Sequence, residues 1–169
     1  MSTYGNYDNF IALQLSDGSL VNCSIIDTAG QEKFRAMSQI YYKKADCCLL
    51  VYDITSQRSF EEIKNYYTKE IRDNCKEDIK VILLGNKTDK ESSREVESEE
   101  GASLALENRY IFMESSCADN TNVADAFITL IENTNIEMKK KKKKNENEDE
   151  NLKIEKNEKE VALQKRRCC

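Results

Sequence analysis

The sequence predicts an α/β fold in which a mostly parallel sheet carries helices on both faces. Two apolar runs, residues 47–52 and 81–84, do not alternate with polar residues and so resemble strands that are buried on both sides. Residues 110–113 form a third run of this kind. Strands that alternate with helices imply right-handed crossovers, which place the loops that follow the strands along one rim, where ligands bind.

The first expected element is a β-hairpin. Residues 10–15 and 21–26 are apolar enough to form its strands, and Asp17-Gly18 lies between them. An Asp-Gly pair favours a tight turn because glycine adopts a positive φ without steric cost. These residues therefore predict a hairpin ahead of the parallel strands.

Four helices are expected between and after the strands, because apolar residues recur there every three or four positions. The clearest stripe consists of Phe60, Ile63, Tyr67 and Ile71. The four helices are predicted over residues 34–42, 60–72, 99–108 and 123–136.

Composition predicts one globular domain with a charged extension. The chain has 169 residues, of which 39% are apolar, and we expect the domain over residues 1–138. Residues 139–167 are rich in Lys, Glu and Asn and predict a flexible linker, within which residues 139–144 are an unbroken lysine run. The net charge of -5 argues against a protein that binds nucleic acid, because such proteins need a basic face.

Cysteine usage and the lack of histidine exclude the usual zinc patterns. The seven cysteines include no C-x-x-C pair, and there is no histidine. This cysteine pattern indicates a reducing, cytosolic compartment. The sequence shows neither a signal peptide nor an apolar stretch long enough to span a membrane, so we expect any membrane contact to come from a lipid.

The segment Asp27-Thr28-Ala29-Gly30-Gln31 follows the second predicted strand. At a strand end, the carboxylate of Asp27 can reach a magnesium ion through water, and Gly30 can bring a backbone N–H to a γ-phosphate. Gln31 is placed to orient an attacking water. An ordinary strand-to-turn junction is the alternative, and the continuation Glu32-Lys33-Phe34 argues against it.

A second polar segment, Asn86-Lys87-Thr88-Asp89, follows the strand at residues 81–84. The carboxylate of Asp89 can accept hydrogen bonds from both N1 and N2 of guanine, whereas adenine presents no such pair of donors. A polar loop that only caps the strand is the alternative. After the last strand, Ser116-Cys117-Ala118 can offer a backbone N–H to the guanine oxygen.

From about Ser2 to Glu137 the chain resembles the Rab family of small GTPases, in the Ras superfamily. The resemblance rests on residues 27–34, 41–45 and 50–55 and on the terminal Cys168-Cys169. It implies a P-loop NTPase-like (Ras-like) fold that binds GTP or GDP with Mg²⁺ and acts in vesicle transport. The implied nucleotide contacts are Asp27, Thr28, Ala29, Gly30, Gln31, Asn86, Lys87, Asp89, Ser116, Cys117 and Ala118.

The resemblance also assigns roles to single residues. Asp27 binds magnesium through water, and Gln31 is the catalytic residue that positions water. Thr3-Tyr4-Gly5 resembles the Thr-Ile-Gly of the first switch, which makes Thr3 a magnesium ligand; a frayed polar N-terminus is the alternative. The chain departs from the family at Ile26, where Rabs usually carry tryptophan, and at Ala118, where they carry lysine.

The phosphate-binding motif G-x-x-x-x-G-K-[ST] does not occur in these 169 residues. The resemblance therefore implies that the first strand, the P-loop and the first helix are missing, and that this strand belongs between those ending at Asp27 and Asp53. We accordingly expect weakened nucleotide binding and negligible GTP hydrolysis by this chain. A non-catalytic Rab-like interaction scaffold and a decayed gene product that does not fold are the alternatives.

Cys168 and Cys169 resemble the double-cysteine end on which Rabs carry two geranylgeranyl groups. Two lipid chains give stable anchoring, so the resemblance implies a protein on the cytoplasmic face of a membrane, handled by the Rab escort and prenyl-transfer machinery. If the cysteines remain unmodified thiols, the chain is expected in the cytosol. The lysine run is expected to be a solvated linker more than a lipid site.

Overall fold

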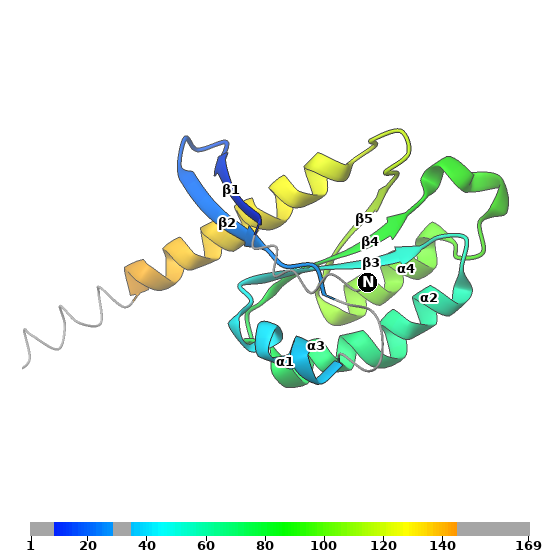
Figure 1. Cartoon of the computed structure of the whole chain (residues 1–169), viewed down its shortest axis with the longest axis horizontal. Helices are drawn as coiled ribbons and strands as arrows, with labels where there is room; N and C mark the ends of the chain where they lie inside the picture. The colour runs from blue at the N-terminus through cyan, green and yellow to red at the C-terminus, as the bar shows by residue number, and fades with distance from the viewer. Residues whose placement is uncertain (1–8, 29–34, 145–169) are drawn as a thin grey trace, which may run out of the picture. The chain divides into compact units, whose positions relative to one another are not determined.

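The computed structural model describes residues 9–28 and 35–144. The chain divides into two compact units, residues 1–134 and residues 135–169. The first unit contains the sheets (Figure 1). In chain order the elements are β1 (Asn9–Gln14), β2 (Leu20–Ile25), α1 (Arg35–Lys44), β3 (Cys47–Asp53), α2 (Gln57–Glu62), η2 (Ile63–Tyr67), α3 (Thr68–Asn74), β4 (Lys80–Asn86), η3 (Thr88–Ser93), α4 (Ser98–Asn108) and β5 (Ile111–Ser115), and a helix over residues 123–144 follows.

The predicted hairpin is confirmed. β1 and β2 pair antiparallel, with Asn9 opposite Ile25 and Gln14 opposite Leu20. Gly18 closes the turn with a φ of 79°, and its N–H donates to the carbonyl of Leu15 at 2.9 Å. The positive φ explains why glycine stands at this position.

The predicted parallel strands are also confirmed. They form a three-stranded sheet in the order β3-β4-β5, with both pairs parallel. The hairpin forms a sheet of its own, so the described strands make two sheets and not one continuous sheet. Among the described residues no ladder of hydrogen bonds joins β2 to β3.

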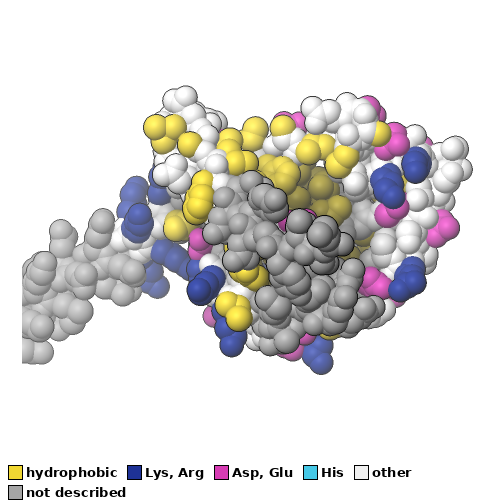
Figure 2. Space-filling view, viewed as in Figure 1, with side chains coloured by type: hydrophobic (Ala, Val, Ile, Leu, Met, Phe, Trp, Pro, Cys, Tyr) yellow, Lys and Arg dark blue, Asp and Glu magenta, His cyan; other side chains and the backbone are white. Residues whose placement is uncertain are grey.

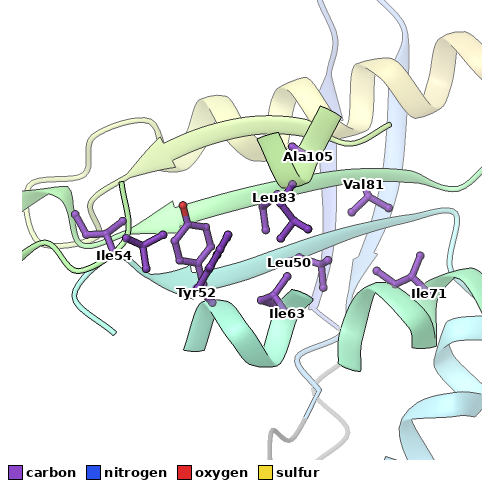
Figure 3. Packing of buried hydrophobic residues seen from close by; sticks show 11 residues of the cluster. Leu50, Tyr52, Ile54, Ile63, Ile71, Val81, Leu83 and Ala105 are labelled. Atoms are coloured by element: carbon purple, nitrogen blue, oxygen red, sulfur yellow. The ribbon is translucent and has the colours of Figure 1, made fainter. Parts of the chain in front are cut away.

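Helices cover both faces of the parallel sheet, as the sequence predicts. On one face, Leu50 and Tyr52 of β3 and Leu83 of β4 pack against Ile63 and Ile71 (Figure 3). On the other face, Ile82 and Leu84 of β4 pack against two residues of the last helix, Ala126 and Leu130. Because β4 is buried on both sides, its sequence is apolar without alternation.

Several helices extend beyond one of their predicted bounds. The helix predicted from residue 60 begins at Gln57, since the side chain of Ser56 caps it by accepting from the N–H of Ser59. It contains one turn of π-helix, in which the N–H of Thr68 donates to the carbonyl of Ile63. The last helix continues to residue 144. Within the described ranges, no helix combines the length and the apolar character that crossing a membrane requires.

Candidate functional site

The three parallel strands end level with one another. In the register of the sheet, Asp53 lies beside Asn86, and Asn86 lies beside Ser115. The loops after β3, β4 and β5 therefore start at the same edge. This is the carboxyl edge, where open α/β sheets bind their ligands.

The loop after β4 turns sharply at Lys87. This residue adopts a left-handed conformation, with a φ of 74° and a ψ of 39°. Its ammonium Nζ lies 2.5 Å from Oδ2 of Asp53 at the end of the neighbouring strand. The N–H of Lys90 then donates to the carbonyl of Lys87 at 2.9 Å, which begins the short helix η3 that carries Asp89.

A hydrogen bond joins the loops after β4 and β5. The hydroxyl of Ser116, which is fully buried, donates to Oδ1 of Asp89 at 2.7 Å. The same hydroxyl oxygen accepts from the N–H groups of Ala118 at 3.2 Å and Asp119 at 3.4 Å. This bonding fixes both the carboxylate of Asp89 and the backbone turn that contains Cys117.

The structure thus brings together the predicted base-contacting residues Asn86, Lys87, Asp89 and Ser116–Ala118 at one edge of the sheet. Asp89, Cys117 and Ala118 are exposed, so a ligand can reach them. A fixed, accessible carboxylate beside a turn of backbone fits the edge of a guanine base, which presents two N–H donors and one carbonyl oxygen.

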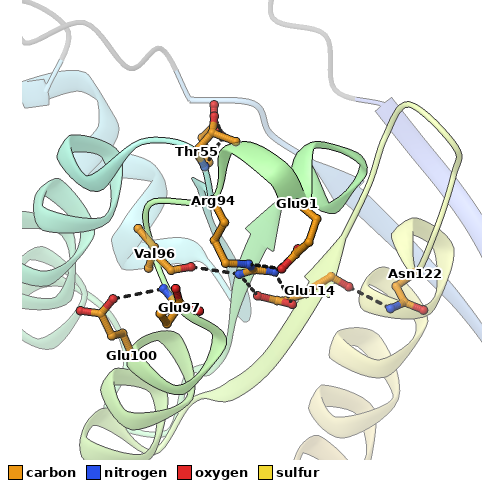
Figure 4. Close-up of polar contacts among 9 residues, drawn as sticks. Thr55, Glu91, Arg94, Val96, Glu97, Glu100, Glu114 and Asn122 are labelled. Carbon is orange, nitrogen blue, oxygen red and sulfur yellow. Dashed lines mark hydrogen bonds and ion pairs between the residues drawn. The ribbon is translucent and has the colours of Figure 1, made fainter.

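Arg94 is a residue of this region that the sequence motifs do not identify (Figure 4). Its guanidinium is nearly buried, with 9% of the side chain exposed, and it donates to Glu91 at 2.7 Å and to Glu114 at 2.8 Å. These bonds, from Glu91 first and then Glu114, raise the pKa of Arg94. Asn122 donates to the carbonyl of Glu114 at 2.9 Å, so the loop between residues 115 and 122 is held at both ends.

The structure describes only some of the residues that are predicted to contact the phosphates and Mg²⁺. Asp27 and Thr28 follow β2 and are exposed. Thr3, the segment Ala29-Gly30-Gln31 and the terminal Cys168-Cys169 lie outside the described residues. Within residues 9–28 and 35–144, no group of three or more His, Cys, Asp or Glu side chains is arranged to hold a metal ion.

Comparison with known proteins assigns this chain to a family. Residues 2–136 match the family model described as "Ras family". This chain belongs to the Ras family. The Ras-like arrangement of its parallel strands and helices agrees with that assignment, and the relatives compared below are Rab proteins.

Three relatives of this Ras-family chain illustrate the similarity. Ras-related protein Rab-8A of Rattus norvegicus is 41% identical over 122 residues, which cover 72% of this chain and 58% of the relative. Rab-8B of Pongo abelii is 42% identical over 114 residues, or 68% of this chain and 55% of the relative. Rab-37 of Mus musculus is 45% identical over 114 residues, or 68% of this chain and 51% of the relative. The chain therefore spans little more than half the length of these Rab proteins.

Proposed function

We propose that this chain is a Rab-like small GTP-binding protein of vesicle trafficking, and that its loops after β4 and β5 recognise guanine. The observation that carries the proposal is the hydrogen bond between Ser116 and Asp89, because it fixes an exposed carboxylate at the carboxyl edge of the sheet. The Rab relatives support the same function.

In this proposal the carboxylate of Asp89 accepts hydrogen bonds from N1 and N2 of guanine. Asn86 and Lys87 complete the base site from the same loop, and the turn Ser116-Cys117-Ala118 faces the guanine oxygen. Adenine has no matching pair of donors and would leave the carboxylate unpaired, which is how such a site gains selectivity.

Nucleotide titrations of the purified chain test base recognition. GDP should bind more tightly than ADP, and Asp89→Ala should abolish the difference. Asp125→Ala removes an exposed carboxylate from the last helix and should leave the preference unchanged. Equal affinities of the unaltered chain for GDP and ADP would contradict the proposal.

The residues proposed to contact the phosphates are Asp27, Thr28, Ala29, Gly30 and Gln31. Thr3 is proposed to bind Mg²⁺ directly, and Asp27 is proposed to bind it through water. When bound, the magnesium ion neutralises charge on the phosphates. The motif G-x-x-x-x-G-K-[ST] does not occur in these 169 residues, and we propose that this chain therefore makes about five fewer charge-assisted hydrogen bonds to phosphate than a protein that carries the motif. At about 1.5–3 kcal/mol each, their loss removes at least ~7 kcal/mol, or about five decades of affinity.

Membrane attachment is proposed to depend on geranylgeranyl groups on Cys168 and Cys169, after the domain at residues 1–138 and the linker at residues 139–167. Three basic residues before the cysteines, Lys165, Arg166 and Arg167, add about 1 kcal/mol each on an anionic cytoplasmic leaflet. The Rab escort and prenyl-transfer machinery would then be partners. Mass spectrometry of the cellular protein tests the anchor, and two free C-terminal thiols would exclude it.

A non-catalytic Rab-like scaffold is the second candidate function. It is favoured by the parallel sheet β3-β4-β5, which is covered on both faces in this chain. Thermal unfolding separates the candidates. A cooperative transition that GDP raises supports the GTP-binding protein, and a cooperative transition that GDP leaves unchanged supports the scaffold. The absence of any cooperative transition would indicate a decayed gene product.

A further inference from the structure

We infer that Asp53 is a positioning residue for the loop Asn86–Asp89, because its carboxylate holds Lys87 and thereby sets the course of the backbone toward Asp89. The inference deepens the proposed function, and its consequence for nucleotide binding rests on that proposal. No motif of the sequence assigns this role to Asp53. The argument starts from the two oxygen atoms of its carboxylate.

Each carboxylate oxygen of Asp53 has its own partners. Oδ1 accepts from the backbone N–H of Thr55 at 2.9 Å and from the Thr55 hydroxyl at 2.7 Å. Oδ2 lies 2.5 Å from Nζ of Lys87. The backbone of Asp53 is held as well, since its N–H donates to the hydroxyl of Ser59 at 3.0 Å. Asp53 is therefore a fixed anchor and Lys87 is the group that it restrains.

The ion pair with Asp53 restrains the loop at Lys87, where its backbone turns sharply. A lysine in the left-handed region is held there by its surroundings, because a side chain with a Cβ disfavours that conformation. Lys87 follows Asn86, which lies directly beside Asp53 in the sheet, and Asp89 is two residues further on. A change in the backbone angles of Lys87 would therefore swing Asp89 away from Ser116.

The charges of both partners support a persistent ion pair. Burial alone would raise the pKa of Asp53, but hydrogen bonds from Lys87 and Thr55 outweigh it and leave the pKa below its usual value. The hydrogen bond to Asp53, with a smaller contribution from Asp89, raises the pKa of Lys87. Both groups are thus ionised at neutral pH.

The chain provides a matched control at the other end of β3. Asp46, just before the strand, pairs with Lys76 at 2.6 Å. The two pairs share residue types and nearly the same distance. Asp46 lies at the amino edge of the strand, away from the proposed base loops. A general effect of removing an Asp–Lys pair from the protein would therefore show in Asp46→Asn also.

Hydrogen exchange measured by mass spectrometry tests the positioning directly, without nucleotide. We expect Asp53→Asn to accelerate exchange of the amides at residues 86–93 about threefold to tenfold, and Asp46→Asn to leave them unchanged. Lys87→Met removes the same ion pair from its other end and should accelerate the same amides, which covers the case of an Asp53 variant that does not fold. Unchanged exchange in either folded variant would overturn the inference.

Nucleotide binding tests the consequence. In the full chain, Asp53→Asn should weaken GDP binding about threefold to tenfold, and adding Lys87→Met should weaken it by less than the product of the two single effects. A chain that shows no preference for GDP over ADP would refute the proposed function, while the exchange measurement would still decide the role of Asp53. A chain that prefers GDP and binds it equally well after Asp53→Asn would overturn the inference alone.

Discussion

Gly101 lies on the buried side of α4, beside the aromatic rings of Tyr52 and Phe112. A Cβ atom at this position would lie 2.5 Å from the hydroxyl of Tyr52 and 2.5 Å from Cε2 of Phe112. Cβ atoms do not approach nonbonded heavy atoms this closely, so a side chain here requires the helix or the rings to move. The lack of a side chain at residue 101 therefore sets how closely α4 approaches the sheet.

We predict that Gly101→Ala destabilises the protein by about 1–3 kcal/mol through overpacking. Alanine favours helices by about 1 kcal/mol over glycine, so a purely local effect would have the opposite sign. Urea denaturation measures the difference in unfolding free energy. Ser103→Ala, at an exposed position of the same helix, is the control and should be neutral. A stabilised Gly101→Ala variant would contradict the close approach of α4.

The ion pair between Asp53 and Lys87 predicts a pH dependence. The lowered pKa of Asp53 gives stability that is complete above the unfolded value of about 3.9 and is lost as the pH falls through the folded pKa. The raised pKa of Lys87 gives stability that is complete below the unfolded value of about 10.4 and is lost as the pH rises through the folded pKa. The difference in unfolding free energy between the native chain and Asp53→Asn should therefore be largest between about pH 5 and pH 9. A difference that is flat down to pH 2 would show that the charge of Asp53 is not responsible.

Among the elements, the turn between η3 and α4 is tied to β5 by one side chain. Arg94 bonds Glu91 in η3, Glu114 in β5 and the carbonyl of Val96 before α4. Glu114 is largely buried, with 22% of its side chain exposed. Removing Arg94 would leave that carboxylate without its cation in a poorly solvated place.

We predict that Arg94→Met lowers the unfolding free energy by about 3 kcal/mol, because breaking one side of a buried ion pair strands the other charge. Glu91 is exposed, so Glu91→Gln should lower the unfolding free energy far less than Arg94→Met does. Denaturant titrations of both variants test the contrast. Equal losses in the two variants would show that the burial of Glu114 has no energetic consequence.

The elements that sequence could predict are those with a local signal. The unbroken apolar run of β4 and the Asp17-Gly18 turn each follow from neighbouring residues, and both are confirmed. The π-helical turn at residues 63–67 has no such signal, since its bond from Thr68 to Ile63 depends on how the helix packs. The division into two sheets has no local signal either, because strand pairing is a long-range property.

The same distinction applies to the candidate site. Asn86, Lys87, Asp89 and Ser116 follow predicted strands and carry a recognisable motif, so their common location could be predicted. The bonds of Asp53 to Lys87 and of Arg94 to Glu114 join residues 34 and 20 positions apart. They depend on the register of three strands, which the sequence pattern does not specify.

At the scale of the whole molecule, charged groups of both signs are interspersed on the face shown in Figure 2, and hydrophobic side chains lie over the hairpin. Phe10 and Leu20 of the hairpin are 75% and 77% exposed. Asp27 follows the hairpin, two residues after the end of β2. Apolar surface that is exposed in this way favours association with another surface.

We predict that the purified 169-residue chain hydrolyses GTP at a negligible rate. In its proposed role Gln31 orients a water molecule toward a phosphate that is held in place, and the phosphate-binding motif does not occur in these residues. Phosphate release measured with excess GTP and Mg²⁺ tests this. Gln31→Leu is the matched control: turnover that is measurable in the unaltered chain and lost in this variant would overturn the prediction.

The separation of the hairpin from the parallel sheet has a mechanical consequence. A continuous ladder of hydrogen bonds would make the strands open together, whereas two sheets can melt as separate cooperative units. The side of the molecule that carries Asp27 could then loosen while Asp89 and Ser116 keep their geometry. If the proposed function holds, the residues proposed for the phosphates and those proposed for the base would then lose their structure at different temperatures.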